Sequence, residues 1–248
     1  MTTALTPVTG SVHSWDVSTG VDGPGTRFVT FLSGCPLRCR YCQNPDTWLR
    51  DNGTRYSSDD ILAEAAKYVP FITAGGGGAT LSGGEPLQQP DFATALLHGF
   101  KELGLHTALD TSGYLGPLAS DELLDATDLV LLDIKAGQPD TYRRLTSREL
   151  EPTLLFAEHL AARNQPVWVR YVLVPGITDA PEEVNAVAQF AAELGNVERV
   201  DVLPFHTLGQ PKWEALGRRF VLAETPPPTA EQVERARIAF RASGLTTY

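Results

Sequence analysis

The only cysteines of the chain are Cys35, Cys39 and Cys42, which lie close together with the spacing C-x3-C-x2-C. Thiolates in such a compact loop bind zinc ions or iron–sulfur clusters. A structural zinc site needs a fourth ligand, and none of the five histidines lies at a short spacing that supplies one. An odd number of cysteines argues against a disulfide framework. The residues favour a metal centre with an open coordination position, such as an iron–sulfur cluster, with structural zinc or three unconnected thiols as alternatives.

Six short apolar runs predict the strands that position this loop, because all are rich in Val, Leu, Ile, Phe or Thr. They cover residues 27–33, 79–82, 105–109, 129–132, 167–174 and 200–203. Amphipathic segments with helix-start signals alternate with them, beginning near residue 57 and covering 91–103, 121–126, 152–163, 181–194 and 229–243. Near-continuous apolar strands are covered on both faces, which indicates a mostly parallel sheet surrounded by helices. We therefore expect an α/β fold, a partial (β/α)6 TIM-like barrel, in one domain over residues 13–248 after a loose tail at residues 1–12.

Polar residues follow the predicted strands at their carboxyl ends, where parallel β/α folds build their active sites. They are, in chain order, Cys35, Gly83-Gly84-Glu85, Asp110-Thr111, Asp133 with Lys135, and His206. Because these ends meet at one edge of a parallel sheet, we expect the side chains to converge on one rim.

The composition narrows the class of partner. The formal net charge is -10 and the pI is about 4.9. This charge argues against binding to nucleic-acid phosphates or to an anionic membrane. No apolar stretch approaches the length of about 20 residues that a membrane span needs. The first basic residue is Arg27, too late for the start of a signal peptide. We expect a cytoplasmic protein that binds neither nucleic acid nor membrane.

The cysteine loop has an aromatic residue, Tyr41, directly before its last cysteine, and in this it resembles the signature of the radical S-adenosylmethionine (SAM) superfamily. Further segments resemble the glycyl-radical-enzyme activating proteins of that superfamily. These segments are residues 20–27, 41–46, 82–86, 109–113, 133–135, 168–176, 203–206 and 212–213. The resemblance extends from about residue 12 to residue 245.

The resemblance implies a partial barrel of the radical SAM type in which Cys35, Cys39 and Cys42 hold a [4Fe-4S] cluster. It implies SAM contacts from Tyr41, Cys42, Gln43, Gly83, Gly84, Glu85, Asp133, Ile134, Lys135 and His206. It also implies a monovalent-cation site made by Asp110, Thr111, Leu131 and Asp133. The residues alone leave plainer interpretations open: a simple turn at the two glycines, a surface ion pair between Asp133 and Lys135, and a capping or core role for His206.

The implied substrate is a backbone glycine of another protein, from which a 5′-deoxyadenosyl radical removes a hydrogen atom. We expect Asp22, Gly23 and Arg170 to contact that peptide. Strand alternation places Arg170 on one face with Trp168 and Val172, where a buried guanidinium needs an anionic partner. That partner is either the substrate or a structural salt bridge, and the turn at Asp22 is alternatively a simple entry to the following strand.

Several activating proteins carry a cysteine-rich insertion after the cluster loop, whereas here about forty residues without cysteine separate Cys42 from Gly83. This favours pyruvate formate-lyase (formate acetyltransferase) as the protein substrate. A flavodoxin or ferredoxin is the implied electron donor, and Arg27, Arg38 and Arg40 form either a basic patch for it or ordinary solvated surface. The alternatives are activation of another glycyl radical enzyme, radical chemistry on a small molecule, and a non-enzymatic iron–sulfur or zinc protein.

Overall fold

A single eight-stranded sheet organises the computed structural model, which describes residues 7–248. The strand order is β3-β1-β2-β4-β5-β6-β7-β8, and β2 and β4 to β8 run parallel. The strands are β1 (Thr9–Thr19), β2 (Thr26–Leu32), β3 (Thr54–Ser57), β4 (Gly78–Gly83), β5 (His106–Thr111), β6 (Leu129–Asp133), β7 (Val167–Leu173) and β8 (Val197–Pro204). The sheet stays open between β3 and β8, so the predicted partial barrel is confirmed.

The six parallel strands are the six predicted from apolar runs, while β1 and β3 were not predicted. Both pair antiparallel at one edge of the sheet, where their polar residues face water. The expectation of a loose tail over residues 1–12 is wrong for residues 9–12. Residues from Thr9 to Val12 pair with β3, and Val12 is fully buried. Residues 1–6 lie outside the described part of the chain.

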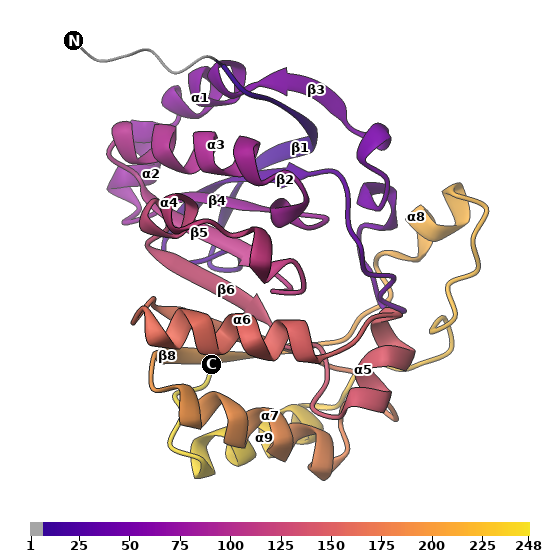
Figure 1. Cartoon of the computed structure of the whole chain (residues 1–248). Coiled ribbons are helices and arrows are strands. Elements are labelled where there is room, and N and C mark those ends of the chain that lie inside the picture. Colours follow the sequence, from indigo (N-terminus) through magenta and orange to yellow (C-terminus); the bar gives the residue numbers. More distant parts are fainter. Residues whose placement is uncertain (1–6) are drawn as a thin grey trace.

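The helices cover the outer face of the sheet, except α5 (Pro139–Thr146) and α8 (Gln210–Ala215), which lie beside the cysteine loop (Figure 1). The others are α1 (Ser58–Ala66), α2 (Val69–Ala74), α3 (Pro90–Glu102), α4 (Asp121–Asp125), α6 (Glu151–Ala162), α7 (Pro181–Leu194) and α9 (Ala230–Ala242). The 3₁₀ turns are η1 (Pro45–Thr47), η2 (Arg50–Asn52), η3 (Pro86–Gln88) and η4 (Gly116–Leu118). Capping boxes at Ser57 with Asp60 and at Thr229 with Gln232 begin α1 and α9, as predicted. The short helices α2, α5 and α8 were not predicted.

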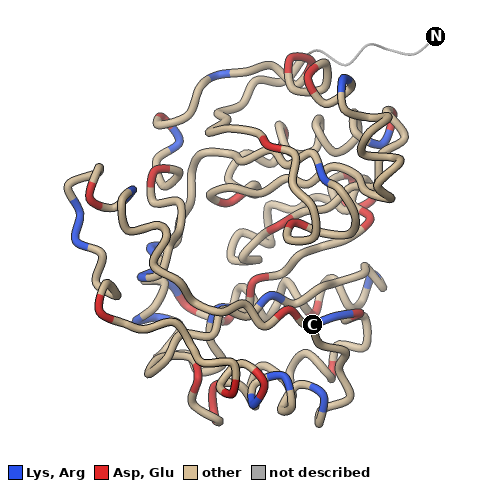
Figure 2. Tube along the Cα trace, turned by 180° about the vertical axis from the view of Figure 1, so that it is seen from behind, with Lys and Arg blue, Asp and Glu red and all other residues tan. Residues whose placement is uncertain are grey.

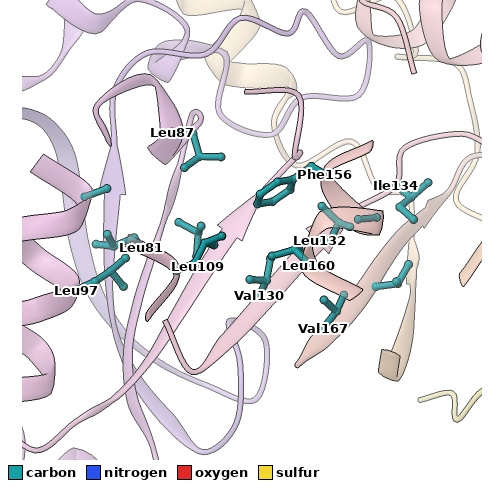
Figure 3. Close-up of a cluster of buried hydrophobic side chains, with 14 of the residues drawn as sticks. Leu81, Leu87, Leu97, Leu109, Val130, Leu132, Ile134, Phe156, Leu160 and Val167 are labelled. Carbon is teal, nitrogen blue, oxygen red and sulfur yellow. The ribbon is translucent and has the colours of Figure 1, made fainter. Parts of the chain in front are cut away.

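The main core lies between the sheet and these helices (Figure 3). Leu81, Leu109 and Leu132 point from the parallel strands toward the helix side, where Leu97 of α3 and Phe156 of α6 meet them. Burial of this apolar surface fixes the strands and therefore the positions of their carboxyl ends.

The two faces of strand β7 lie in different environments, one in the core and the other toward the interior of the barrel. Its residues alternate strictly between buried and half-buried, and Val169 and Tyr171 belong to the buried set. Trp168, Arg170 and Val172 occupy the opposite face, as the alternation predicted. One face builds the core, and the other is free to line an interior cavity.

Arg27 is a core residue of the barrel. Its side chain is fully buried, and its guanidinium donates to Thr80 Oγ1 at 2.9 Å and contacts His106 Nδ1 at 3.0 Å. Burial lowers the pKa of Arg27 to about 10. Both alternatives expected for Arg27, a basic patch and solvated surface, are therefore wrong, because the side chain is buried and ties β2 to β4 and β5 from inside.

No helix within residues 7–248 combines the length and the apolar character that crossing a bilayer demands.

Candidate functional site

A cavity of about 300 Å³ lies inside the barrel, at the lower end of the range for small-molecule sites. Asp22, which precedes β2, and Cys35, which follows it, both line the cavity. The carbonyl of Asp22 accepts a hydrogen bond from Thr80 Oγ1 in the middle of β4 at 2.7 Å, so the turn at Asp22 folds into the barrel toward the other lining residues.

Backbone hydrogen bonds fix the cysteine loop although it has no regular secondary structure. The amides of Arg38 and Arg40 donate to the carbonyls of Thr146 and Leu145 at the end of α5, at 2.8 and 2.9 Å. The amide of Cys35 donates to the carbonyl of Trp48 at 3.1 Å. The positions of the three thiols are therefore set by the surrounding fold.

Helix α8 packs against the last cysteine of the loop. The indole of Trp213 donates to the carbonyl of Cys42 at 2.8 Å and packs edge-on against Trp48, with ring centroids 5.0 Å apart. Lys212 donates to Asn44 Oδ1 at 2.7 Å, and the ammonium lies 3.3 Å from Asp46. These contacts fasten a segment more than 160 residues distant in sequence onto the cysteine loop.

The environment of the three thiols suits binding to cationic iron. Burial raises the pKa of Cys35 and Cys42, and raises that of Cys39 to about 12. Bare thiolates are costly here, and iron would supply the compensating positive charge. Within residues 7–248 no three His, Cys, Asp or Glu side chains are grouped to hold a single metal ion. The thiols share one cavity wall instead, and a four-iron cluster takes ligands spread farther apart than one ion does.

The glycines after β4 bring backbone directly against the cysteine loop. Gly83 has φ +114°, and a Cβ there would lie 2.4 Å from the backbone nitrogen of Leu32. A Cβ on Gly84 would lie 2.4 Å from the carbonyl oxygen of Gly34. Both glycines line the cavity, so they present backbone groups to its interior where no side chain fits.

Two ion pairs lie on the cavity wall. Arg170 Nη1 is 3.0 Å from Asp110 Oδ2, and Lys135 Nζ is 2.9 Å from Asp133 Oδ2. Ser82 also donates to Asp110 at 2.5 Å, while the other carboxylate oxygen of Asp110 is buried without a partner in the described residues. The site therefore offers both signs of charge at neighbouring strand ends.

The electrostatics keep both cations charged. Burial alone would lower the pKa of Arg170 and of Lys135, but Asp110 and Asp133 raise the pKa of Arg170, and Asp133 raises that of Lys135. Burial raises the pKa of Asp110, although Arg170 opposes that shift. A zwitterionic ligand with an ammonium and a carboxylate matches such a mixed wall.

Known proteins are similar in sequence to this chain over nearly its whole length. The sequence pattern of the Radical SAM superfamily matches residues 29–191. The pyruvate formate-lyase-activating enzyme of Listeria monocytogenes is 43% identical over 240 residues, 94% of this chain and 96% of the relative. The pyruvate formate-lyase 1-activating enzyme of Escherichia coli is 41% identical over 233 residues, 93% of this chain and 94% of the relative. The chain belongs to the pyruvate formate-lyase-activating enzymes of the radical SAM superfamily.

Solved structures of radical SAM proteins share the fold. A domain of a pyruvate-formate lyase-activating enzyme from Bacteroides vulgatus superposes with a TM-score of 0.59 at 24% identity, covering 69% of this chain and 98% of that domain. A radical SAM methyltransferase from Sphaerobacter thermophilus gives a TM-score of 0.65 at 17% identity, covering 98% of this chain and 76% of that protein. At these identities the likeness establishes the fold alone.

Most site residues expected from the radical SAM resemblance line this one cavity. They are Cys35, Cys39, Tyr41, Cys42, Gln43, Gly83, Gly84, Asp110, Thr111, Asp133, Lys135, Arg170, His206 and Asp22. The amide of Gln43 donates to the carbonyls of Tyr41 and His206, both at 3.0 Å, and so joins the cysteine loop to the end of β8. The cysteine loop and the ends of β4, β5, β6 and β8 therefore line one cavity, and Arg170 from the middle of β7 and the turn at Asp22 line it as well.

Four expected residues are absent from the cavity lining in the described chain: Gly23, Glu85, Leu131 and Ile134. Leu131 packs against Ala108, and Ile134 belongs to the main core. The fully buried carboxylate of Glu85 is bonded to the end of β5. A ligand in the cavity therefore does not meet the side chains of these residues.

Sequence reasoning missed several residues of the site. Ser82 and Ser112 lie in segments that carry the family resemblance, which could have marked them as site residues. The sequence did not indicate that Ser82 donates to Asp110 or that Ser112 donates to Glu85. Trp48 gave no signal, because its place beside Trp213 depends on a tertiary contact.

Proposed function

We propose that this protein activates pyruvate formate-lyase by generating a glycyl radical on its backbone. The observation that carries the proposal is the cavity in which Cys35, Cys39 and Cys42 face the glycine pair Gly83 and Gly84. The relatives that match over nearly the whole chain are pyruvate formate-lyase-activating enzymes, which supports the choice of partner. When bound, a [4Fe-4S] cluster and SAM supply an electron and a 5′-deoxyadenosyl radical that removes one hydrogen atom from the glycine Cα.

The three thiols would hold the cluster, and the adjoining wall would hold SAM. The backbone groups at Gly83 and Gly84 suit the ammonium of the methionyl group, and Lys135 suits its carboxylate. His206 lies at the end of β8 on the same cavity, where it would border the adenosine. The contribution of the protein is to orient the cofactor and to exclude water.

A monovalent cation would fit between the strand ends of β5 and β6. Asp110 keeps one buried oxygen without a partner, and Thr111 and Asp133 line the same part of the cavity. The backbone carbonyl of Leu131, in the same strand as Asp133, is the proposed fourth ligand. Oxygen donors of this type suit a hard cation.

The substrate glycine would bind beside Asp22 and Arg170, which line the same cavity. Glycine suits the reaction because its radical delocalises into both flanking peptide groups without side-chain strain. We place the reaction in the cytoplasm under anaerobic conditions, with a flavodoxin or ferredoxin as electron donor.

Electron paramagnetic resonance tests this proposal. The reconstituted protein, SAM and a reductant are mixed with pyruvate formate-lyase without oxygen, and a glycyl doublet with an equal amount of 5′-deoxyadenosine is expected. A Cys39→Ala variant, which lacks one cluster ligand, should give neither product. If 5′-deoxyadenosine forms without the doublet, another substrate is indicated and the proposed partner is wrong.

A further inference from the structure

The charge of this acidic protein is distributed unevenly. Most Lys and Arg side chains pair with a carboxylate, among them Arg163 with Asp121 and Arg235 with Glu231. Arg50 in η2 and Arg55 in β3 are exposed and make no ion pair within the described residues, and six more exposed or half-exposed arginines share this property. These six are Arg38, Arg40, Arg144, Arg148, Arg218 and Arg219, which we call the arginine face.

The arginine face surrounds the cysteine loop. The guanidinium carbons of Arg38 and Arg218 lie 5.0 and 5.4 Å from the ring centroid of the same Trp48, so two distant segments bring their charges together. The backbone amide of Arg40 is bonded to the end of α5, the helix that carries Arg144. The segment that carries α8 lies at the left edge of Figure 2, where its basic stretches alternate with acidic ones.

The neighbouring carboxylates only partly offset this charge, because Glu214 and Glu224 in the segment around α8 make no ion pair within the described residues, whereas two others are already paired. Asp46 is held by His13 at 2.9 Å and by Lys212, and Glu149 is held by Arg143. Arg50 is exposed beside Asp51, and that pair of opposite charges is left out of the arginine face. A positive patch, even on a protein of net charge -10, attracts an acidic surface and repels a basic one.

Exposed apolar groups complete the patch. Leu49, next to Trp48, is 56% exposed, and Leu216, two residues before Arg218, is 39% exposed. Apolar groups among arginines are typical of protein interfaces. The six arginines are outside the cavity lining, whereas the cysteines form part of it, so this patch covers the outer side of the cysteine loop.

We propose that the arginine face is the docking surface of an acidic one-electron donor protein. The proposal rests on the proposed function, which requires an electron at the cysteine loop while SAM and the peptide occupy the cavity. The outer side of the loop then remains as the short route for the electron. The donor is oxidised by one electron and the cluster is reduced by one, without making or breaking a covalent bond.

Charge reversal tests the docking surface. An Arg40→Glu/Arg219→Glu double variant is suitable, because neither side chain makes a hydrogen bond or ion pair within residues 7–248. Its matched control is Arg235→Glu/Arg237→Glu, the same change of net charge on α9. The probe is a reduced acidic flavodoxin, with cluster reduction followed by absorbance at low salt and binding to the protein followed by calorimetry.

We expect the bimolecular rate of cluster reduction by the flavodoxin to fall at least about tenfold in the double variant and less than about twofold in the control. Salt at about 0.5 M should remove the difference, because it screens charges within a few ångströms. Flavodoxin affinity should fall in parallel. Equal rates and affinities in the double variant and the wild type would overturn the docking surface.

A neutral photochemical reductant separates this proposal from the proposed function. With that reductant, the double variant should form the glycyl radical as well as the wild type does. Failure of the wild type to form it would refute the proposed function while leaving the flavodoxin result interpretable. If flavodoxin reduction is normal but radical formation falls with the neutral reductant, the face docks the protein substrate and the donor proposal is wrong.

Discussion

The carboxylate of Glu85 accepts a hydrogen bond from Ser112 Oγ at 2.5 Å and another from the Ser112 backbone amide at 3.0 Å. It also accepts from Thr111 Oγ1 at 2.7 Å and from the Leu87 amide at 3.2 Å. Burial raises the pKa of Glu85 even though these donors oppose the shift. The side chain therefore acts as a brace that holds the turn after Gly84 against the end of β5.

Replacement of Glu85 by Gln should disturb this brace, because an amide nitrogen would face donors. We expect a loss of about 1–3 kcal/mol in the free energy of unfolding at pH 7. SAM affinity should also fall, because the brace positions the glycine turn and Thr111. Urea denaturation and calorimetric titration of the reconstituted protein measure the two effects.

Glu183→Gln is the matched control for the brace. Glu183 is also buried and accepts from the amides of Gly137 and Gln138 at 2.8 and 3.0 Å, but it does not line the cavity. We expect lower stability with unchanged SAM affinity. Equal SAM affinity in the Glu85 variant and the wild type would show that the brace does not position the site.

Gly83→Ala should damage the SAM site more than a glycine replacement elsewhere. Its Cβ would collide with the Leu32 backbone at a positive φ, a combination that costs several kcal/mol or forces the turn away. Gly104 also has positive φ, but a Cβ there meets nothing within 4 Å, so Gly104→Ala should cost about 1–2 kcal/mol. SAM titration and urea denaturation compare them, and equal SAM affinity in both variants would contradict the close approach.

Trp213→Phe should make the cluster easier to lose. The variant keeps an aromatic ring beside Trp48 but removes the hydrogen bond to the Cys42 carbonyl, worth about 1 kcal/mol. We expect the cluster absorbance to decay roughly fivefold faster in a chelator. Trp168→Phe is the control, since its indole donates to exposed Glu198 at 3.2 Å. Equal decay rates would mean that α8 does not secure the loop.

Asp128 should make the free energy of unfolding depend on pH in the acidic range. Burial alone would raise its pKa, but Lys101 and Thr107 hold the pKa below 3.8. A carboxylate with a depressed folded pKa stabilises above its unfolded pKa, and that stability is lost as pH falls through the folded value. Asp128→Asn should therefore cost about 1–2 kcal/mol at pH 7, reduced by solvent screening, and much less near pH 3. A cost that does not change between pH 7 and pH 3 would contradict this assignment.

The sequence was informative where local chemistry decides the structure. Apolar runs located the six parallel strands, and side-chain caps at Ser57 and Thr229 marked two helix starts. It failed where tertiary pairing decides. Polar β1 becomes a strand because β2 and β3 flank it, and α8 owes its place to Trp213.

The candidate site shows the same limit. Residue types and spacing placed the cysteines and the two aspartates on one rim. They did not show that Glu85 turns toward Ser112, or that Arg27 is buried, because both depend on hydrogen-bond partners from other strands.

Isotope transfer tests the central claim most directly. Pyruvate formate-lyase is prepared with glycine deuterated at Cα and incubated without oxygen with the reconstituted protein, SAM and a reductant. Mass spectrometry of the 5′-deoxyadenosine should show one deuterium for each glycyl radical formed. Unlabelled 5′-deoxyadenosine beside unchanged pyruvate formate-lyase would contradict the account.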